Sequence, residues 1–144
     1  MQTLEAFEAL VGDWTTEMTH RLLPGTELRG RSTFELLDGG RFLIQREWVD
    51  HPDFPDSSVA LIGGTDDLRM HYFDARGIAR VLELTIEQNV WTFTRHAPDF
   101  SPLDFHQRLT WTLGDGGTTI AGLAEMSEDG ENWQDDLHIT YRRR

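Results

Sequence analysis

The most constraining feature of this sequence is a succession of short segments in which apolar and polar residues alternate, with turn signals between them. Strict alternation over several residues predicts half-buried strands. Because nearly all the connections are short, strands that are adjacent in sequence should also be adjacent in space. The turns are expected at Pro24-Gly25, Asp38-Gly39-Gly40, Asp66-Asp67, Ala75-Arg76-Gly77, Glu87-Gln88-Asn89, Asp115-Gly116-Gly117 and Glu128–Asn132.

About ten strands are predicted in this way, at a spacing typical of sandwiches and barrels. A short helix over residues 2–10 precedes them, with Leu4, Phe7 and Leu10 on one apolar stripe and Gly12 placed to end it. Residues 51–57 and 97–102 should be loops, because each contains two prolines. The strands are expected at 14–22, 28–37, 41–49, 58–65, 68–74, 78–86, 90–96, 104–113, 118–127 and 133–142.

An up-and-down meander of this many strands tends to close on itself, which removes its edges. The fold class predicted is therefore all-β, a single antiparallel β-barrel domain spanning residues 1–144 with a short N-terminal helix. A β-sandwich is the competing fold, but it usually needs longer crossovers.

Composition excludes several classes of function. There is no cysteine, so disulfides and cysteine metal sites are excluded and a reducing, cytoplasmic compartment is expected. No apolar run approaches the ~20 residues of a membrane span, and no signal peptide is recognisable. A net charge of −12 should repel phosphate backbones, so no nucleic-acid partner is expected. Residues 142–144, all arginine, are expected to be a solvated chain end.

Several motifs resemble a known family. The segment Leu10-Val11-Gly12-Asp13-Trp14 resembles the short helix and G-x-W opening of lipocalin-like (calycin) proteins. Residues 37–43, 72–74 and 139–142 are similar to the "GGRF", "YD" and "ITYTR" landmarks of a family of small bacterial lipocalin-like domains of unknown function. The resemblance extends over essentially the whole chain and implies a calycin barrel.

Nitrobindins and fatty-acid-binding proteins are more distant relatives by this resemblance. Nitrobindins bind haem through a histidine of the last strand, where this chain has His138. By alternation, however, His138 faces away from Leu137 and Ile139. Fatty-acid-binding barrels hold a carboxylate with buried arginines and a final-strand tyrosine, which implies such roles for Arg46, Arg95 and Tyr141. The arginine-x-tyrosine spacing of that family is absent here.

Two arginines stand out from the residues themselves. Arg46 is expected on an inward face with Phe42, Ile44 and Trp48, and Arg95 lies beside Trp91 and Phe93. A guanidinium on an apolar face needs an anionic partner. That partner is either a ligand carboxylate or, more commonly, an Asp or Glu of a neighbouring strand, and snorkelling to the barrel mouth is a third outcome.

The ligand-binding candidates combine these arginines with side chains predicted to face inward, although core packing is the commoner role for each aromatic. His20 follows Trp14 and Met18 on the inward face of the first strand. The candidates are Arg46, Arg95, Trp14, Met18, His20, Trp48, Trp91, Phe93, Trp111 and Tyr141.

No catalytic residue is predicted. Glu47, Glu83 and Glu125 sit within strands and are expected on the solvated outer face. The six histidines form no pair with helical metal-ligand spacing and no compact cluster, so no metal site is predicted. If haem is bound, His138 or His20 is the ligand.

The leading hypothesis is a non-enzymatic, cytoplasmic protein that binds a small hydrophobic molecule, with or without a carboxyl group, inside the barrel. The second is a haem protein of nitrobindin type that acts on reactive nitrogen species. The third is an enzyme, a cyclase or isomerase that uses the cavity to shape its substrate. Monomer and homodimer are both left open.

Overall fold

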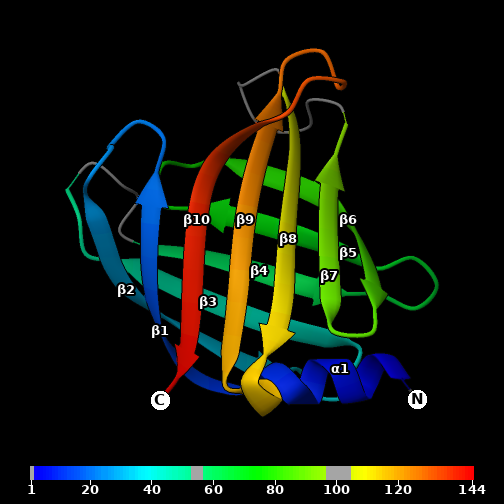
Figure 1. Cartoon of the computed structure of the whole chain (residues 1–144). Coiled ribbons are helices and arrows are strands. Elements are labelled where there is room, and N and C mark those ends of the chain that lie inside the picture. Colours follow the sequence, from blue (N-terminus) through cyan, green and yellow to red (C-terminus); the bar gives the residue numbers. More distant parts are fainter. Residues whose placement is uncertain (1, 53–56, 97–104) are drawn as a thin grey trace.

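The computed structural model describes residues 2–52, 57–96 and 105–144, and these form a closed antiparallel barrel (Figure 1). Each strand pairs with its neighbours in sequence, and the first strand pairs with the last to close the barrel. The expectation of an all-β barrel of about ten strands with a short N-terminal helix is confirmed. The predicted loop at 97–102 and residues 53–56 of the other predicted loop lie outside the described residues.

The elements match the predicted segments closely. The first strand ends at His20 rather than at Leu22, because Leu22 lies in the following turn and is exposed. The elements are α1 (Gln2–Leu10), β1 (Gly12–His20), β2 (Glu27–Leu36), β3 (Phe42–Val49), β4 (Ser57–Gly63), β5 (Arg69–Asp74), β6 (Ala79–Glu87), β7 (Val90–Arg95), β8 (His106–Gly114), η1 (Asp115–Gly117), β9 (Thr119–Ser127) and β10 (Gln134–Arg143).

Helix α1 covers one end of the barrel, at the bottom of Figure 1, where both chain termini lie. Its apolar stripe enters the barrel, and Phe7 and Leu10 are fully buried. The Trp14 indole closes the same end and donates a hydrogen bond from Nε1 to the carbonyl of Leu10 (2.9 Å). None of the helices within the described ranges is long and apolar enough to cross a membrane.

Arg143 links the C-terminus of α1 to the barrel through hydrogen bonds. Its guanidinium donates hydrogen bonds to the carbonyls of Ala9, Val11 and Gly117 and lies 4.2 Å from the centre of the Trp14 ring. The prediction of a solvated chain end is therefore wrong for this residue. The physical reason is that the last carbonyls of a helix lack partners within the helix and attract a cationic donor.

The half of the barrel next to α1 is filled by aromatic rings. Trp111 lies at the centre of this aromatic layer, with ring centroids 4.8 Å from Phe93 and 5.8 Å from Phe34. Gly122, opposite Trp111 on the neighbouring strand, leaves room for the indole, since a Cβ there would lie 3.4 Å from Trp111 and closer still to Ile139. The buried rings of the layer are Phe7, Trp14, Phe34, Trp91, Phe93 and Trp111.

The predicted inward face of β3 is wrong. Leu43, Gln45 and Glu47 face the interior, and Arg46 and Trp48 lie on the outer face. Pairing decides the face, because residues directly opposite on neighbouring strands share a side of the sheet. Gln45 is opposite Phe34 on β2 and Ala60 on β4, and both of these are buried in the barrel.

Candidate functional site

Between the aromatic layer and the barrel end opposite α1, which we call the far end, lies a cavity of about 200 Å³. Its walls combine aliphatic and sulfur-containing side chains with about as many polar ones. A cavity that joins apolar walls with polar groups is suited to a small molecule. The residues discussed below come from a lining that includes Met18, Gln45, Glu47, Ala60, Met70, Tyr72, Arg80, Leu82, Gln107, Leu109, Trp111, Ile139 and Tyr141.

A buried carboxyl group forms one wall of this cavity. Tyr141 Oη donates a hydrogen bond to Glu47 Oε1 (2.7 Å), which joins β10 to β3 across the interior. Gln45 Nε2 donates to the same oxygen (3.1 Å) and also to Ser32 Oγ (3.2 Å). Burial raises the pKa of Glu47, and the hydrogen bond from Tyr141 opposes that rise. Burial and the neighbouring Glu47 raise the pKa of Tyr141.

The raised pKa predicts how Glu47 affects stability. The folded state holds this proton more tightly than the unfolded chain, in which a glutamate titrates near ~4.3. The stability linked to protonation is therefore complete below that pH and is lost as the pH rises through the folded-state pKa. We expect the stability of Glu47→Gln relative to the wild type to increase as the pH rises from about 4.3 to the folded-state pKa of Glu47, and to level off above that pKa. Urea unfolding at a series of pH values measures the difference.

The control for this measurement is Glu83→Gln, which alters an exposed glutamate of β6. Because Glu83 is exposed and does not line the cavity, this variant should not reproduce the pH-dependent gain of Glu47→Gln. A difference between Glu47→Gln and the wild type that stays constant with pH would contradict the assignment of a raised pKa to Glu47.

Two arginines approach the cavity near the far end. Arg95 on β7 is 3% exposed, and its Nε donates a hydrogen bond to Gln107 Oε1 (3.0 Å). Arg80 on β6 lines the cavity, and its Nε has no hydrogen-bond partner among the described residues. Both guanidinium groups lie over the Phe105 ring, at 5.3 and 6.0 Å. Burial and the charge of Arg95 lower the pKa of Arg80.

Asp74, the acid of β5, already has a cationic partner in Arg76. Asp74 Oδ2 accepts hydrogen bonds from Tyr72 Oη (2.9 Å) and from Arg76 Nη2 (2.7 Å). Burial raises the pKa of Asp74, but the hydrogen bonds from Arg76 and Tyr72 outweigh burial and hold it below its ordinary value. Burial and Asp74 in turn raise the pKa of the Tyr72 hydroxyl. Asp74 is therefore the ion-pair partner of Arg76.

The structure separates the predicted ligand-binding residues other than His20 into three groups. Met18, Trp111 and Tyr141 line the cavity, and Arg95 is buried beside Gln107, which also lines it. Trp14, Trp91 and Phe93 belong to the packed aromatic layer.

The third group, Arg46 and Trp48, lies outside the barrel. Arg46 is about half exposed and pairs with Glu35 of the neighbouring strand, which is one of the alternatives anticipated for it. Trp48 packs under Arg31, 4.4 Å from the guanidinium. Together with Val59 and Phe73 they line a shallow groove on the outer surface.

The two histidines considered for haem do not line the cavity. His20 Nδ1 accepts a hydrogen bond from the Leu22 amide (3.0 Å), and its Nε2 lies 3.5 Å from Asp136. His138 faces outward, as alternation predicted, and contacts Asp135 (3.1 Å). A volume of about 200 Å³ is also below the roughly 300 Å³ at which pockets for drug-sized ligands begin. The described residues therefore do not fit haem inside the barrel, and they contain no cluster of metal-ligating side chains.

Sequence reasoning missed Glu47, Gln45, Tyr72 and Arg80. For Arg80 a signal was present, because Arg80 shares its alternation with Leu82, Leu84 and Ile86, as Arg95 does with Trp91 and Phe93. The expectation that Glu47 lies on the outer face is wrong, and the reason is the misassigned face of β3.

No family model and no curated protein matches this sequence. Among solved structures, the fold resembles Rv2717c from M. tuberculosis, with a TM-score of 0.70 and 15% identity over 100% of this chain and 98% of that one. It also resembles a redesigned β-barrel, b11L5F_LGL, with a TM-score of 0.53 and 14% identity over 96% and 95% of the two chains. At these identities the likeness shows a shared fold.

Proposed function

We propose that this protein binds a small, largely apolar molecule with an acidic group inside the barrel, where Arg80 and Arg95 supply the counter-charge. The observation that carries the proposal is the cavity, with the Nε donor of Arg80 unbonded among the described residues. Trp111, which lines the same space, has a second such donor at Nε1. Buried donors without acceptors are rare in folded proteins and favour a site that receives its acceptor from a ligand or from water.

The size of the cavity narrows the ligand class. An apolar cavity of roughly 150 Å³ accepts benzene. A cavity of about 200 Å³ therefore suits one aromatic ring with a short acidic chain, or an aliphatic acid of similar bulk. The long-chain acids of the fatty-acid-binding proteins, which the sequence resemblance suggested, are larger than this space.

Charge supports the position of the acidic group. The chain carries a net charge of −12, so an anion is attracted only where cations are concentrated. Arg80 and Arg95 provide that concentration on β6 and β7, whereas Glu47 lies on the wall formed by β3. Tyr141, compared above with the carboxylate-binding tyrosine of fatty-acid-binding proteins, donates to Glu47 instead. These charges support a position of the ligand's acidic group beside the arginines, away from Tyr141.

Isothermal titration calorimetry with 3-phenylpropanoate and its neutral amide tests this proposal. The wild type should bind the acid more tightly than the amide. Arg80→Met keeps the apolar stem and removes the charge, so it should weaken binding of the acid at least about tenfold, or 1.4 kcal/mol, and leave binding of the amide nearly unchanged. Arg95→Met should act in the same direction.

Arg46→Met is the matched control, because Arg46 lies on the outer face and is paired with Glu35. Its affinity for the acid should equal that of the wild type. Equal affinity of the wild type for acid and amide, or an equal loss in Arg46→Met and Arg80→Met, would refute the proposed position of the ligand.

A further inference from the structure

The proposed binding of an acid assigns no role to Glu47, although its carboxyl group lines the cavity. In the described residues, both hydrogen bonds to this carboxyl group end on Oε1. Oε2 therefore remains available to a molecule in the cavity. A general base needs one oxygen directed at the ligand and a fixed orientation. Glu47 meets both conditions, because hydrogen bonds hold its Oε1 and its Oε2 is directed toward the cavity.

We infer that Glu47 transfers a proton on the bound molecule, so that the cavity catalyses a 1,3-proton shift, either keto–enol tautomerisation or double-bond isomerisation, of a small 2-oxo or unsaturated acid. This inference rests on the proposed function, because the arginines must first hold the acidic group. It assigns a proton-transfer reaction to the binding site and narrows the ligand class from small acids to 2-oxo or unsaturated acids.

The reaction needs no co-reactant. With a 2-oxo acid, Glu47 Oε2 takes a proton from carbon 3, and the electrons of that C–H bond form the C2–C3 double bond. The carbonyl π electrons move to the oxygen on carbon 2 and leave an enolate. The protonated Glu47 then returns the proton to that oxygen and gives the enol. The arginines stabilise the negative charge as it develops beside the carboxylate.

The surroundings of Glu47 suit this role. Tyr141 and Gln45 hold Oε1, so they are positioning residues that direct Oε2 toward the cavity. Burial raises the pKa of Glu47 above its ordinary value, and a carboxylate with a raised pKa is a stronger base. Arg80 does not form an ion pair with Glu47 in the described residues, and the carboxyl group keeps its basicity.

The charged and titratable groups that face Glu47 come from several strands. Tyr141 on β10 donates to it, and Tyr72 on β5 interacts with it electrostatically. Arg80 on β6 lines the same cavity. Arg108 and Glu125, on β8 and β9, are paired with each other through two hydrogen bonds (2.9 and 3.0 Å). Tyr141 is thus the group whose removal should change the titration of Glu47 most directly.

Proton NMR of phenylpyruvate in D₂O measures the reaction, because deuterium replaces the protons on carbon 3 each time the enolate forms. The wild type should accelerate this exchange over buffer. Glu47→Gln should lower the acceleration by about 100-fold or more, as expected for loss of a general base, while calorimetry shows phenylpyruvate binding within threefold of the wild type. Glu83→Gln, on the exposed face of β6, should exchange as fast as the wild type.

Tyr141→Phe gives a test that a purely structural role would not pass. The hydrogen bond from Tyr141 lowers the pKa of Glu47. Its removal should move the rising limb of the pH–rate profile to higher pH, with exchange retained.

The outcomes separate the two proposals. Binding of phenylpyruvate without accelerated exchange, or undiminished exchange in Glu47→Gln, would overturn the catalytic role and leave the binding function intact. If phenylpyruvate and 3-phenylpropanoate both fail to bind, the binding proposal and the reaction fall together.

Discussion

Replacing Trp111 by Ala is expected to lower the free energy of unfolding by about 4 kcal/mol. Trp111 is 1% exposed and has ring contacts with Phe34, Phe93 and Tyr141, among others, so its removal leaves a hole where the aromatic layer meets the cavity. Urea unfolding followed by circular dichroism measures the loss.

Two further variants sharpen this test. Trp111→Phe keeps a ring in the layer and removes an indole N–H that has no partner among the described residues, so it should cost less than half as much as the alanine variant. Trp133→Ala removes a half-buried tryptophan that stacks on Arg108 at 4.3 Å, and about 1 kcal/mol is expected. Equal losses in Trp111→Ala and Trp133→Ala would show that the aromatic layer is not the core of the fold.

Replacing Arg143 by Met should lower the free energy of unfolding by about 2 to 3 kcal/mol, since hydrogen bonds from a charged donor are each worth more than neutral ones. The change leaves the carbonyls of Ala9, Val11 and Gly117 without their donor and removes the cation from the Trp14 ring. The same urea titration measures it.

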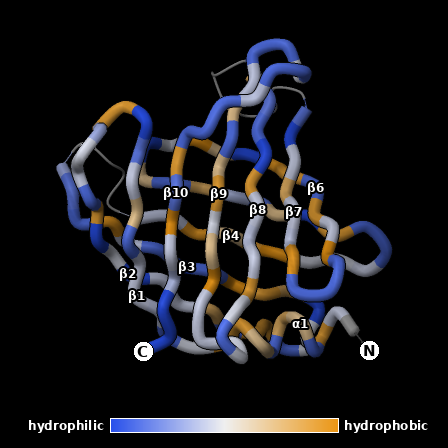
Figure 2. Tube along the Cα trace, in the orientation of Figure 1, coloured by the Kyte–Doolittle hydropathy of each residue, from blue (hydrophilic) through white to orange (hydrophobic). Residues whose placement is uncertain are grey.

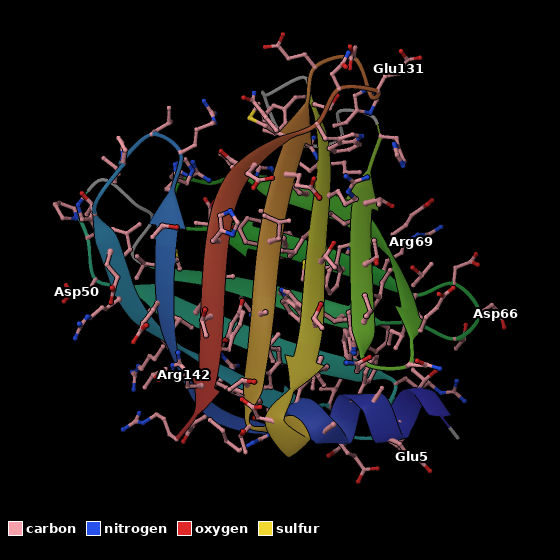
Figure 3. The ribbon with its side chains drawn as sticks, viewed as in Figure 1. Glu5, Asp50, Asp66, Arg69, Glu131 and Arg142 are labelled. Atoms are coloured by element: carbon pink, nitrogen blue, oxygen red, sulfur yellow. The ribbon has the colours of Figure 1, made fainter. Side chains whose placement is uncertain are left out.

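Arg142→Met is the matched control, because Arg142 is the exposed neighbour of Arg143 and is labelled on the outside of the molecule in Figure 3. It should change stability by less than about 0.5 kcal/mol. Comparable losses in the two variants would show that closure of the helix end does not depend on Arg143.

Alternation predicted the barrel because most strands have one clearly apolar face. Figure 2 shows polar and apolar residues alternating along the front strands, and the inward faces assigned to β7 and β10 agree with the observed burial. The pattern failed at β3, where both faces are partly apolar. One face carries Phe42, Ile44 and Trp48, and the other carries Leu43 and Val49. Hydrophobicity alone cannot choose between two such faces. The pairing of β3 with β2 and β4 does so.

The candidate site was predictable only in part, for a related reason. Arg95, Met18, Trp111 and Tyr141 lie on strands whose inward face is unambiguous, and each was identified from the sequence. The hydrogen bond between Tyr141 and Glu47 joins residues 94 positions apart and exists only because the barrel closes around them. No local spacing encodes such a contact.

The interior differs from the surface in how charge is arranged. Charged side chains such as Glu5, Asp50, Asp66, Arg69 and Glu131 point outward (Figure 3). Arg80 and Glu47 instead line the cavity, and Arg95 is buried beside it. Buried charges of this kind are costly unless they are neutralised or used. In the proposed complex the acidic end of the ligand lies at the arginines and its reactive carbon lies at Glu47.

A crystal structure of the protein soaked with 4-bromobenzoate tests the central claim most directly, because the anomalous signal of bromine marks the ligand without ambiguity. We predict a bromine peak inside the barrel, with the carboxylate within hydrogen-bonding distance of Arg80. Bromine found only in the outer groove of Arg46, Trp48 and Phe73, with the interior empty of ligand, would contradict the account.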